Sequence, residues 1–235
     1  MKIEIWSDVV CPFCYIGKRK LEKALEKFPF KEQIQVEWKS FQLNPDQQTN
    51  PNLNTLEHLA QSKGWSMDQT RQITSQVVEM AKAEGLDFDF EKAVVANTKR
   101  AHQMIHLAKE LNLQDEMKER LLRAYFSEGK NVDDLDTLVS LGKELGLEEN
   151  KIKLTLESNS LESAVDQDIY ESRLIGVRGV PFFVLDRKFG ISGAQPDEVF
   201  EGTLEKAWTE FAKNNSVLEI TPGTDGGSCD LEGNC

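Results

Sequence analysis

The segment KIEIWSDVVCPFCYIG, residues 2–17, decides the fold of this chain. In its first part, Ile3 and Ile5 alternate with polar residues, which is typical of a short β-strand. A helical pattern begins near Phe13, so Cys11 lies at a strand-to-helix turn and Cys14 lies one turn further along. The segment therefore predicts two cysteines at the N-terminus of a helix that follows a strand.

The next residues extend this pattern into a β-α-β unit. Apolar positions recur at helical spacing through residues 14–28, and Pro29 follows the end of that helix. Ile34, Val36 and Trp38 then alternate with polar residues and predict a second strand. Because a helix between two neighbouring strands joins them in parallel by a right-handed crossover, the first 45 residues predict the start of an α/β sheet.

The middle of the chain is expected to be helical, and the last third to resume the α/β pattern. Helical periodicity dominates residues 46–159, for example from Met67 to Ala83 and from Lys92 to Leu111. We then expect a helix, two strands and a closing helix at residues 161–174, 180–185, 189–192 and 196–212. The predicted organisation is a discontinuous α/β domain (1–45 and 160–213), an all-helical insertion (46–159) and a flexible tail (214–235).

Composition and charge exclude several classes of function. The 235 residues are 39% hydrophobic and 29% charged, as in an ordinary globular protein, and the formal net charge is -12. That charge opposes attraction to nucleic acids or anionic lipids. Acidic Glu4 and Asp8 stand where a signal peptide would need an apolar run, and no segment reaches membrane-spanning length. We therefore expect a cytoplasmic protein without nucleic-acid or membrane partners.

The Cys11-Pro12-Phe13-Cys14 motif carries the candidate chemistry. Structural disulfides are disfavoured in a reducing compartment, so these cysteines indicate catalysis, metal binding or redox sensing. Unpaired N–H groups and the helix dipole favour an anion at a helix N-terminus, which predicts a lowered pKa for Cys11. We expect Cys11 to be the nucleophile and Cys14 to resolve the mixed disulfide, the two alternating between dithiol and redox-active disulfide.

Two other interpretations of the motif remain open from the residues alone. A zinc half-site would need further ligands, and Cys229 and Cys235 are separated more widely than cysteines in structural zinc sites usually are. His58, His102 and His106 are further possible ligands, although a surface or interlobe role is the simpler interpretation of His102 and His106. The cysteines could also be incidental buried residues. Their position favours redox chemistry, and we expect no metal.

The N-terminal motif and a second stretch, GVRGVPFFV at residues 176–184 with SGAQ at 192–195, resemble the DsbA family, in particular its cytoplasmic FrnE-like branch. The resemblance implies a thioredoxin fold with a large all-helical insertion. It also implies a cis Val180–Pro181 bond beside Cys11, with Val180, Pro181 and Phe13 binding substrate. The periplasmic relatives have Pro-His between the cysteines, so Phe13 predicts a less oxidising disulfide, below about -120 mV.

The expected function is therefore that of a thiol-disulfide oxidoreductase or isomerase acting on protein or small-molecule thiols, reset by a cellular thiol reductant. No cofactor is expected, with glutathione left open as a co-substrate. One alternative is a glutathione-dependent isomerase or transferase, because 2-hydroxychromene-2-carboxylate isomerases resemble this architecture, although those relatives usually have serine near Cys11. The other is a redox-sensing chaperone.

The cysteines of the tail allow three roles. Cys229 and Cys235 could form a second redox pair that exchanges with the first, a separate structural disulfide, or a metal-binding end. The linker from Asn214 to Cys229 could stretch about 50 Å, which is long enough to reach the first pair. Two of these three roles place a second disulfide between Cys229 and Cys235.

Overall fold

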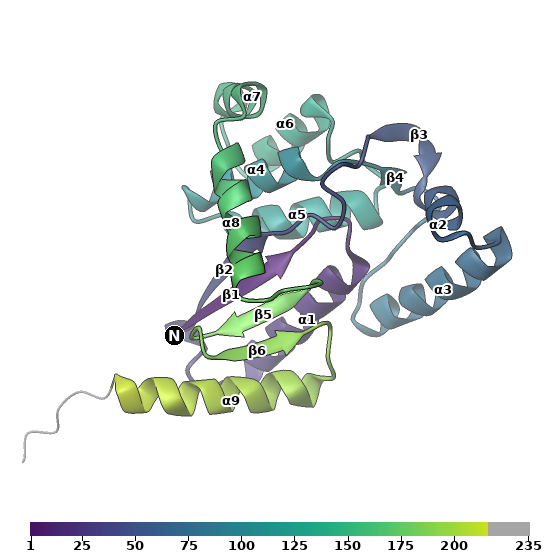
Figure 1. Cartoon of the computed structure of the whole chain (residues 1–235). Helices are drawn as coiled ribbons and strands as arrows, with labels where there is room; N and C mark the ends of the chain where they lie inside the picture. The colour runs from purple at the N-terminus through teal and green to yellow at the C-terminus, as the bar shows by residue number, and fades with distance from the viewer. Residues whose placement is uncertain (216–235) are drawn as a thin grey trace, which may run out of the picture.

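A four-stranded mixed sheet organises the part of the chain that the computed structural model describes, residues 1–215 (Figure 1). Its strand order is β2-β1-β5-β6; β1 and β2 are parallel, whereas β5 pairs antiparallel with both β1 and β6. The sheet and the two helices beside it comprise β1 (Lys2–Ser7), α1 (Pro12–Lys27), β2 (Gln35–Ser40), β5 (Phe182–Leu185), β6 (Phe189–Ser192) and α9 (Asp197–Asn214).

Alternation along the strands gives the sheet two buried faces. Ile3 and Ile5 of β1 and Phe183 of β5 are fully buried in the main core, into which α1 and α9 also pack. Trp6 and Val184 point to the opposite face and form a smaller cluster with Val177. Because successive side chains of a strand point to opposite faces, this pattern fixes the register of β1 against β5.

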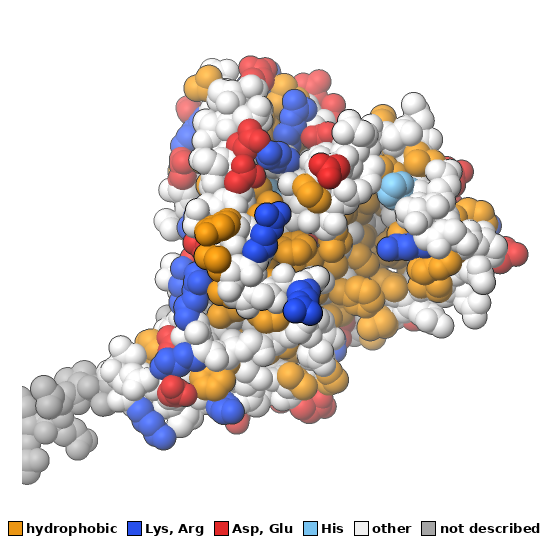
Figure 2. Space-filling view, in the orientation of Figure 1, with side chains coloured by type: hydrophobic (Ala, Val, Ile, Leu, Met, Phe, Trp, Pro, Cys, Tyr) orange, Lys and Arg blue, Asp and Glu red, His pale blue; other side chains and the backbone are white. Residues whose placement is uncertain are grey.

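A helical lobe, residues 55–158, lies between β2 and the return to the sheet, and α8 leads back to β5 (Figure 1). In the same orientation, Figure 2 shows a hollowed area lined mainly by apolar side chains between the sheet and the arm formed by α2 and α3. No helix within residues 1–215 combines the length and the apolar character needed to cross a bilayer. The helices are α2 (Thr55–Lys63), α3 (Met67–Ala83), α4 (Lys99–Lys109), α5 (Gln114–Phe126), α6 (Leu135–Glu144), α7 (Glu149–Ser158) and α8 (Glu162–Leu174); a short 3-10 turn, η1 (Lys31–Gln33), precedes β2.

The inserted segment is not all-helical, which corrects the expectation from periodicity. β3 (Asn50–Asn54) and β4 (Val94–Val95) form a small antiparallel pair. The helix expected from Lys92 begins only at Lys99, because the preceding backbone pairs with β3 and the carbonyl of Ala93 accepts the N–H of Thr55 at 2.8 Å. This pairing joins two segments that are distant in sequence, which helical periodicity does not report.

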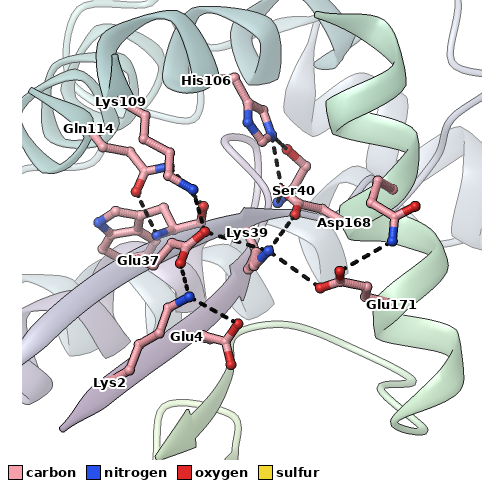
Figure 3. A network of polar contacts seen from close by, with 12 residues as sticks. Lys2, Glu4, Glu37, Lys39, Ser40, His106, Lys109, Gln114, Asp168 and Glu171 are labelled. Atoms are coloured by element: carbon pink, nitrogen blue, oxygen red, sulfur yellow. Dashed lines mark hydrogen bonds and ion pairs between the residues drawn. The ribbon is translucent and has the colours of Figure 1, made fainter. Parts of the chain in front are cut away.

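A network of buried charges holds α8 and α4 against the edge strand β2 (Figure 3). The carboxylate of Asp168 accepts the backbone N–H of Ser40 and the ammonium group of Lys39, both at 2.9 Å. His106 Nε2 lies 3.0 Å from the same carboxylate, and its side chain is 11% exposed. His106 therefore has the interlobe position expected of it, and Asp168 ties the helical segment to the sheet.

Candidate active site

The two motif cysteines occupy the first turn of α1. Cys11 is the N-cap residue, with extended backbone (φ -92°, ψ 113°), and Pro12 follows it at the first helical position. Proline suits this position because its fixed φ is helical and the N–H that it lacks would be unpaired there. Cys11 and Cys14 are free thiols; Cys11 is 4% exposed and Cys14 is inaccessible. Cys11 is therefore the more accessible residue of the two.

The Val180–Pro181 bond is cis, as the resemblance implies, and Val180 meets the first cysteine. The Cys11 thiol donates to the carbonyl oxygen of Val180 at 3.4 Å. The carbonyl of Pro181 accepts the N–H of Gly193 at 2.8 Å, so a backbone hydrogen bond holds the proline next to Val180. The two sequence motifs thus converge, although 169 positions separate Cys11 from Val180.

Close packing between α1 and β5 depends on Gly17. A Cβ atom at this position would lie 3.1 Å from the ring of Pro181 and 3.1 Å from the ring of Phe183. Such contacts are shorter than ordinary van der Waals separations, so only glycine fits without movement of its neighbours. Gly17 therefore allows the helix that carries the cysteines to approach the Val180–Pro181 segment.

The prediction of a lowered pKa for Cys11 is wrong for the reduced pair. The neighbouring Cys14 sulfur raises the pKa of Cys11, and burial and the charge of Asp8 add to this effect. Burial opposes ionisation of Cys14 as well, yet its pKa is lowered because the Cys11 thiol and the ammonium group of Lys118 stabilise the thiolate. The helix N-terminus acts on both sulfurs, whereas the hydrogen bond from Cys11 and the charge of Lys118 favour the thiolate of Cys14.

Two buried basic residues of the helical lobe lie at this site, and the sequence marked neither as part of the thiol chemistry, since it offered His102 only as a possible zinc ligand. Lys118 of α5 is 1% exposed, and its ammonium group lies 5.4 Å from the centre of the Trp38 ring. His102 of α4, also 1% exposed, places Nε2 at 3.2 Å from a carboxylate oxygen of Asp8. Burial lowers the pKa of Lys118 and of His102. Since both residues follow helical patterns, only their three-dimensional position marks them.

Asp8 connects this buried group to the loop before Cys11. Its carboxylate accepts the N–H groups of Val9 and Leu43, both at 2.8 Å, in addition to the contact with His102. Burial alone would raise the pKa of Asp8, but these hydrogen bonds and His102 keep it below the ordinary value. Asp8 therefore remains ionised and fixes the backbone immediately before the first cysteine.

The outer side of the site offers room for a substrate. Phe13, between the cysteines, is 38% exposed. A hollow of about 490 Å³ begins at Val10, and its other walls include Leu43, His58 and Tyr125. Within residues 1–215, no three His, Cys, Asp or Glu side chains cluster in a way that would hold a metal ion. Cys229 and Cys235, and with them any second disulfide, lie outside the described residues.

Comparison with known proteins assigns the chain to a family. The DSBA-like thioredoxin domain matches residues 2–205. The uncharacterized protein YwbO of Bacillus subtilis (strain 168) is 30% identical over 206 residues, which cover 86% of this chain and 94% of that protein. A probable DsbA oxidoreductase from Streptomyces coelicolor is 34% identical, with a TM-score of 0.85 and coverage of 99% of this chain and 97% of that chain.

A more distant solved structure shares the fold. The cytosolic disulfide reductase DsbM from Pseudomonas aeruginosa, solved with GSH, is 19% identical, with a TM-score of 0.64 and coverage of 89% of this chain and 100% of that chain. The fold is thus a DsbA-like thioredoxin fold with a helical insertion. With the family match over residues 2–205 and a relative 30% identical along 86% of the chain, this protein belongs to the DSBA-like thioredoxin domain family.

Proposed function

We propose that this protein is a thiol-disulfide oxidoreductase of the cytoplasm that uses Cys11 as nucleophile and Cys14 as resolving thiol. The observation that carries the proposal is the position of the Cys11 thiol at a helix N-terminus, 3.4 Å from the Val180 carbonyl. An extended substrate backbone laid against Val180 would bring its own sulfur to Cys11. The names of its relatives, which include an oxidoreductase and a cytosolic disulfide reductase, support the class of reaction and the compartment.

The proposed cycle begins with proton transfer within the pair. Cys11 passes its proton to the Cys14 thiolate as it attacks one sulfur of a substrate disulfide. A mixed disulfide forms between Cys11 and the substrate, and the other substrate sulfur leaves as a thiolate that takes up a proton. Cys14 then loses its proton and attacks the Cys11 sulfur, which releases the second substrate thiol and leaves a Cys11–Cys14 disulfide.

An external thiol must reduce that disulfide before the next turnover. We propose a low-molecular-weight cellular thiol, and the relative solved with GSH makes glutathione the first to test. With substrate thiols in excess the same steps run in reverse, so the direction depends on the reduction potentials of the partners.

Reduction of insulin by dithiothreitol or glutathione tests this function. The intact protein should accelerate the precipitation of reduced insulin, and Cys11→Ala should abolish the acceleration. A Leu154→Ala variant, altered at an exposed side chain of α7 far from the cysteine pair in sequence, serves as a control for handling and folding. No acceleration by the intact, folded protein with free thiols would refute the proposal.

A further inference from the structure

A second hollow, here called the arginine hollow, lies beside the Val180 segment. It measures about 550 Å³, and its walls include Phe41, Asp46, Tyr170, Arg173, Val177 and Arg178. Val177, in the wall of the hollow, packs with Trp6 in a small hydrophobic cluster, and Val180 packs against the same cluster. The hollow and Val180 are therefore close to each other. Arg178 precedes Val180 by two residues, which places their Cα atoms no more than about 7 Å apart.

The guanidinium groups of this hollow are not engaged by the protein itself. Most of the 28 Lys and Arg side chains face a carboxylate, as expected for a chain with a net charge of -12. Within residues 1–215, however, neither Arg173 nor Arg178 makes an ion pair or side-chain hydrogen bond. Lys99, in the same wall, is already paired with Glu162 and lies 3.9 Å from Asp166. Two guanidinium groups are thus without a partner, while the carboxylates in the walls are those of Asp46 and of Asp166, the latter beside Lys99.

The surroundings of these arginines suit a polypeptide rather than a compact ion. Tyr170 is 54% exposed, and Leu174 and Ile175 at the end of α8 are 67% and 40% exposed. On the face drawn in Figure 2, apolar side chains fill the central area with cations beside them, and most acidic side chains lie nearer the margins. Apolar surface with unpaired guanidinium groups favours an extended segment that carries both apolar and acidic side chains.

We propose that Arg173 and Arg178 select protein substrates with acidic side chains close to the reactive cysteine. The inference rests on the proposed oxidoreductase function and adds the substrate class. A substrate strand beside Val180 would continue past Arg178, where carboxylates a few residues from the substrate sulfur meet the two guanidinium groups. Unpaired charges within a Debye length, about 8–10 Å, act more strongly on such a segment than the distant net charge does.

Single-turnover reduction of matched peptides tests the selection. Each peptide carries one cysteine capped as a disulfide with 2-mercaptoethanol, and the flanking residues are either two Glu or two Gln on each side. The reduced protein should react about fivefold to tenfold faster with the Glu peptide. Arg173→Gln with Arg178→Gln should bring the rate ratio close to one. Lys31→Gln is the matched control. It removes a cation of the η1 turn, before β2 and outside the arginine hollow, so the Glu-to-Gln rate ratio should stay unchanged.

The possible results distinguish failure of the acidic-substrate selection from failure of the proposed oxidoreductase function. A Glu-to-Gln rate ratio of one or less in the intact protein, or a ratio that survives loss of both arginines, would overturn the selection. Failure with both peptides would instead count against the oxidoreductase function. Isothermal titration calorimetry with peptides in which serine replaces the cysteine then measures binding in the absence of thiol exchange. Tighter binding of the Glu peptide than of the Gln peptide, with the difference lost in the Arg173→Gln, Arg178→Gln variant, would support the selection. Equal binding of the two peptides would refute it.

Discussion

The Cys11 thiol lies 3.4 Å from the Val180 carbonyl oxygen, and the pairing of two strands places them together. β1 ends just before the cysteine loop, and its Trp6 pairs with Phe182, the first residue of β5. Because these strands are antiparallel, the end of one lies beside the beginning of the other. The sheet therefore brings the nucleophile and the backbone that would hold a substrate to the same edge.

Replacement of Gly17 by alanine should disturb this edge. The added Cβ would meet Pro181 and Phe183 at 3.1 Å, so the net loss of unfolding free energy should be about 1 kcal/mol or more despite the better helix propensity of alanine. Gly202→Ala is the matched control, because a Cβ there meets nothing within 4 Å and should stabilise α9 slightly. Urea denaturation measures both; equal effects of the two substitutions would contradict the packing argument.

The buried cation at the pair should control thiol ionisation. Lys118→Met removes the charge that helps to stabilise the Cys14 thiolate, so the pKa of Cys14 should rise. The ultraviolet absorbance of the thiolate, followed during a pH titration of the reduced protein, reports this pKa. Lys31→Met, at an exposed lysine, should leave the titration unchanged. An unshifted curve in Lys118→Met would remove Lys118 from the site.

The buried histidine should make stability fall in mild acid. Burial lowers the pKa of His102 below its ordinary 6.5, so the folded protein binds fewer protons at this residue than the unfolded chain does. The free energy of unfolding should therefore decrease as the pH falls below about 6.5, by up to about 1.4 kcal/mol per pH unit. His102→Gln should flatten this slope and His58→Gln should retain it. The same slope in all three proteins would rule out His102 as its source.

Loss of the carboxylate that joins α8 to β2 should cost more stability than loss of a surface carboxylate. Asp168→Asn removes the carboxylate from His106 and leaves Lys39 with only its longer contacts to Glu37 and Glu171, which should lower the free energy of unfolding by about 2 kcal/mol. Asp166→Asn, at a side chain 60% exposed, should cost less than about 0.5 kcal/mol. Denaturant titrations compare the two variants, and similar losses would show that the network contributes little.

The sequence predicts most of the sheet because apolar and polar residues alternate clearly along its strands, as at Ile3 and Ile5. It also predicts the helix Met67–Ala83, because the helical pattern continues there over many residues. It does not predict β3 or β4. Val94–Val95 is too short to show alternation, and Asn50–Asn54 contains proline and mostly polar residues. Such a pair depends on contacts that become visible only in the folded chain.

The candidate site also contains residues that the sequence predicts and residues that it does not. The cysteines and Val180–Pro181 belong to local motifs and could be identified from the sequence. Lys118 and His102 could not, because a lysine or histidine within a helix usually faces solvent, and only the packing of α4 and α5 against the cysteine loop buries these two. The pKa of Cys11 differs from the value expected from the helix dipole alone chiefly because the Cys14 sulfur and burial raise it.

Trapping of the mixed disulfide tests the division of roles between the two thiols most directly. Cys14→Ser and Cys11→Ser variants are each mixed with a disulfide-containing protein, the free thiols are alkylated, and the products are analysed by non-reducing electrophoresis and mass spectrometry. We predict that Cys14→Ser accumulates a disulfide between Cys11 and the substrate, and that Cys11→Ser accumulates little. Equal trapping through Cys14 in the Cys11→Ser variant, or none in either, would contradict the assignment of Cys11 as the nucleophile.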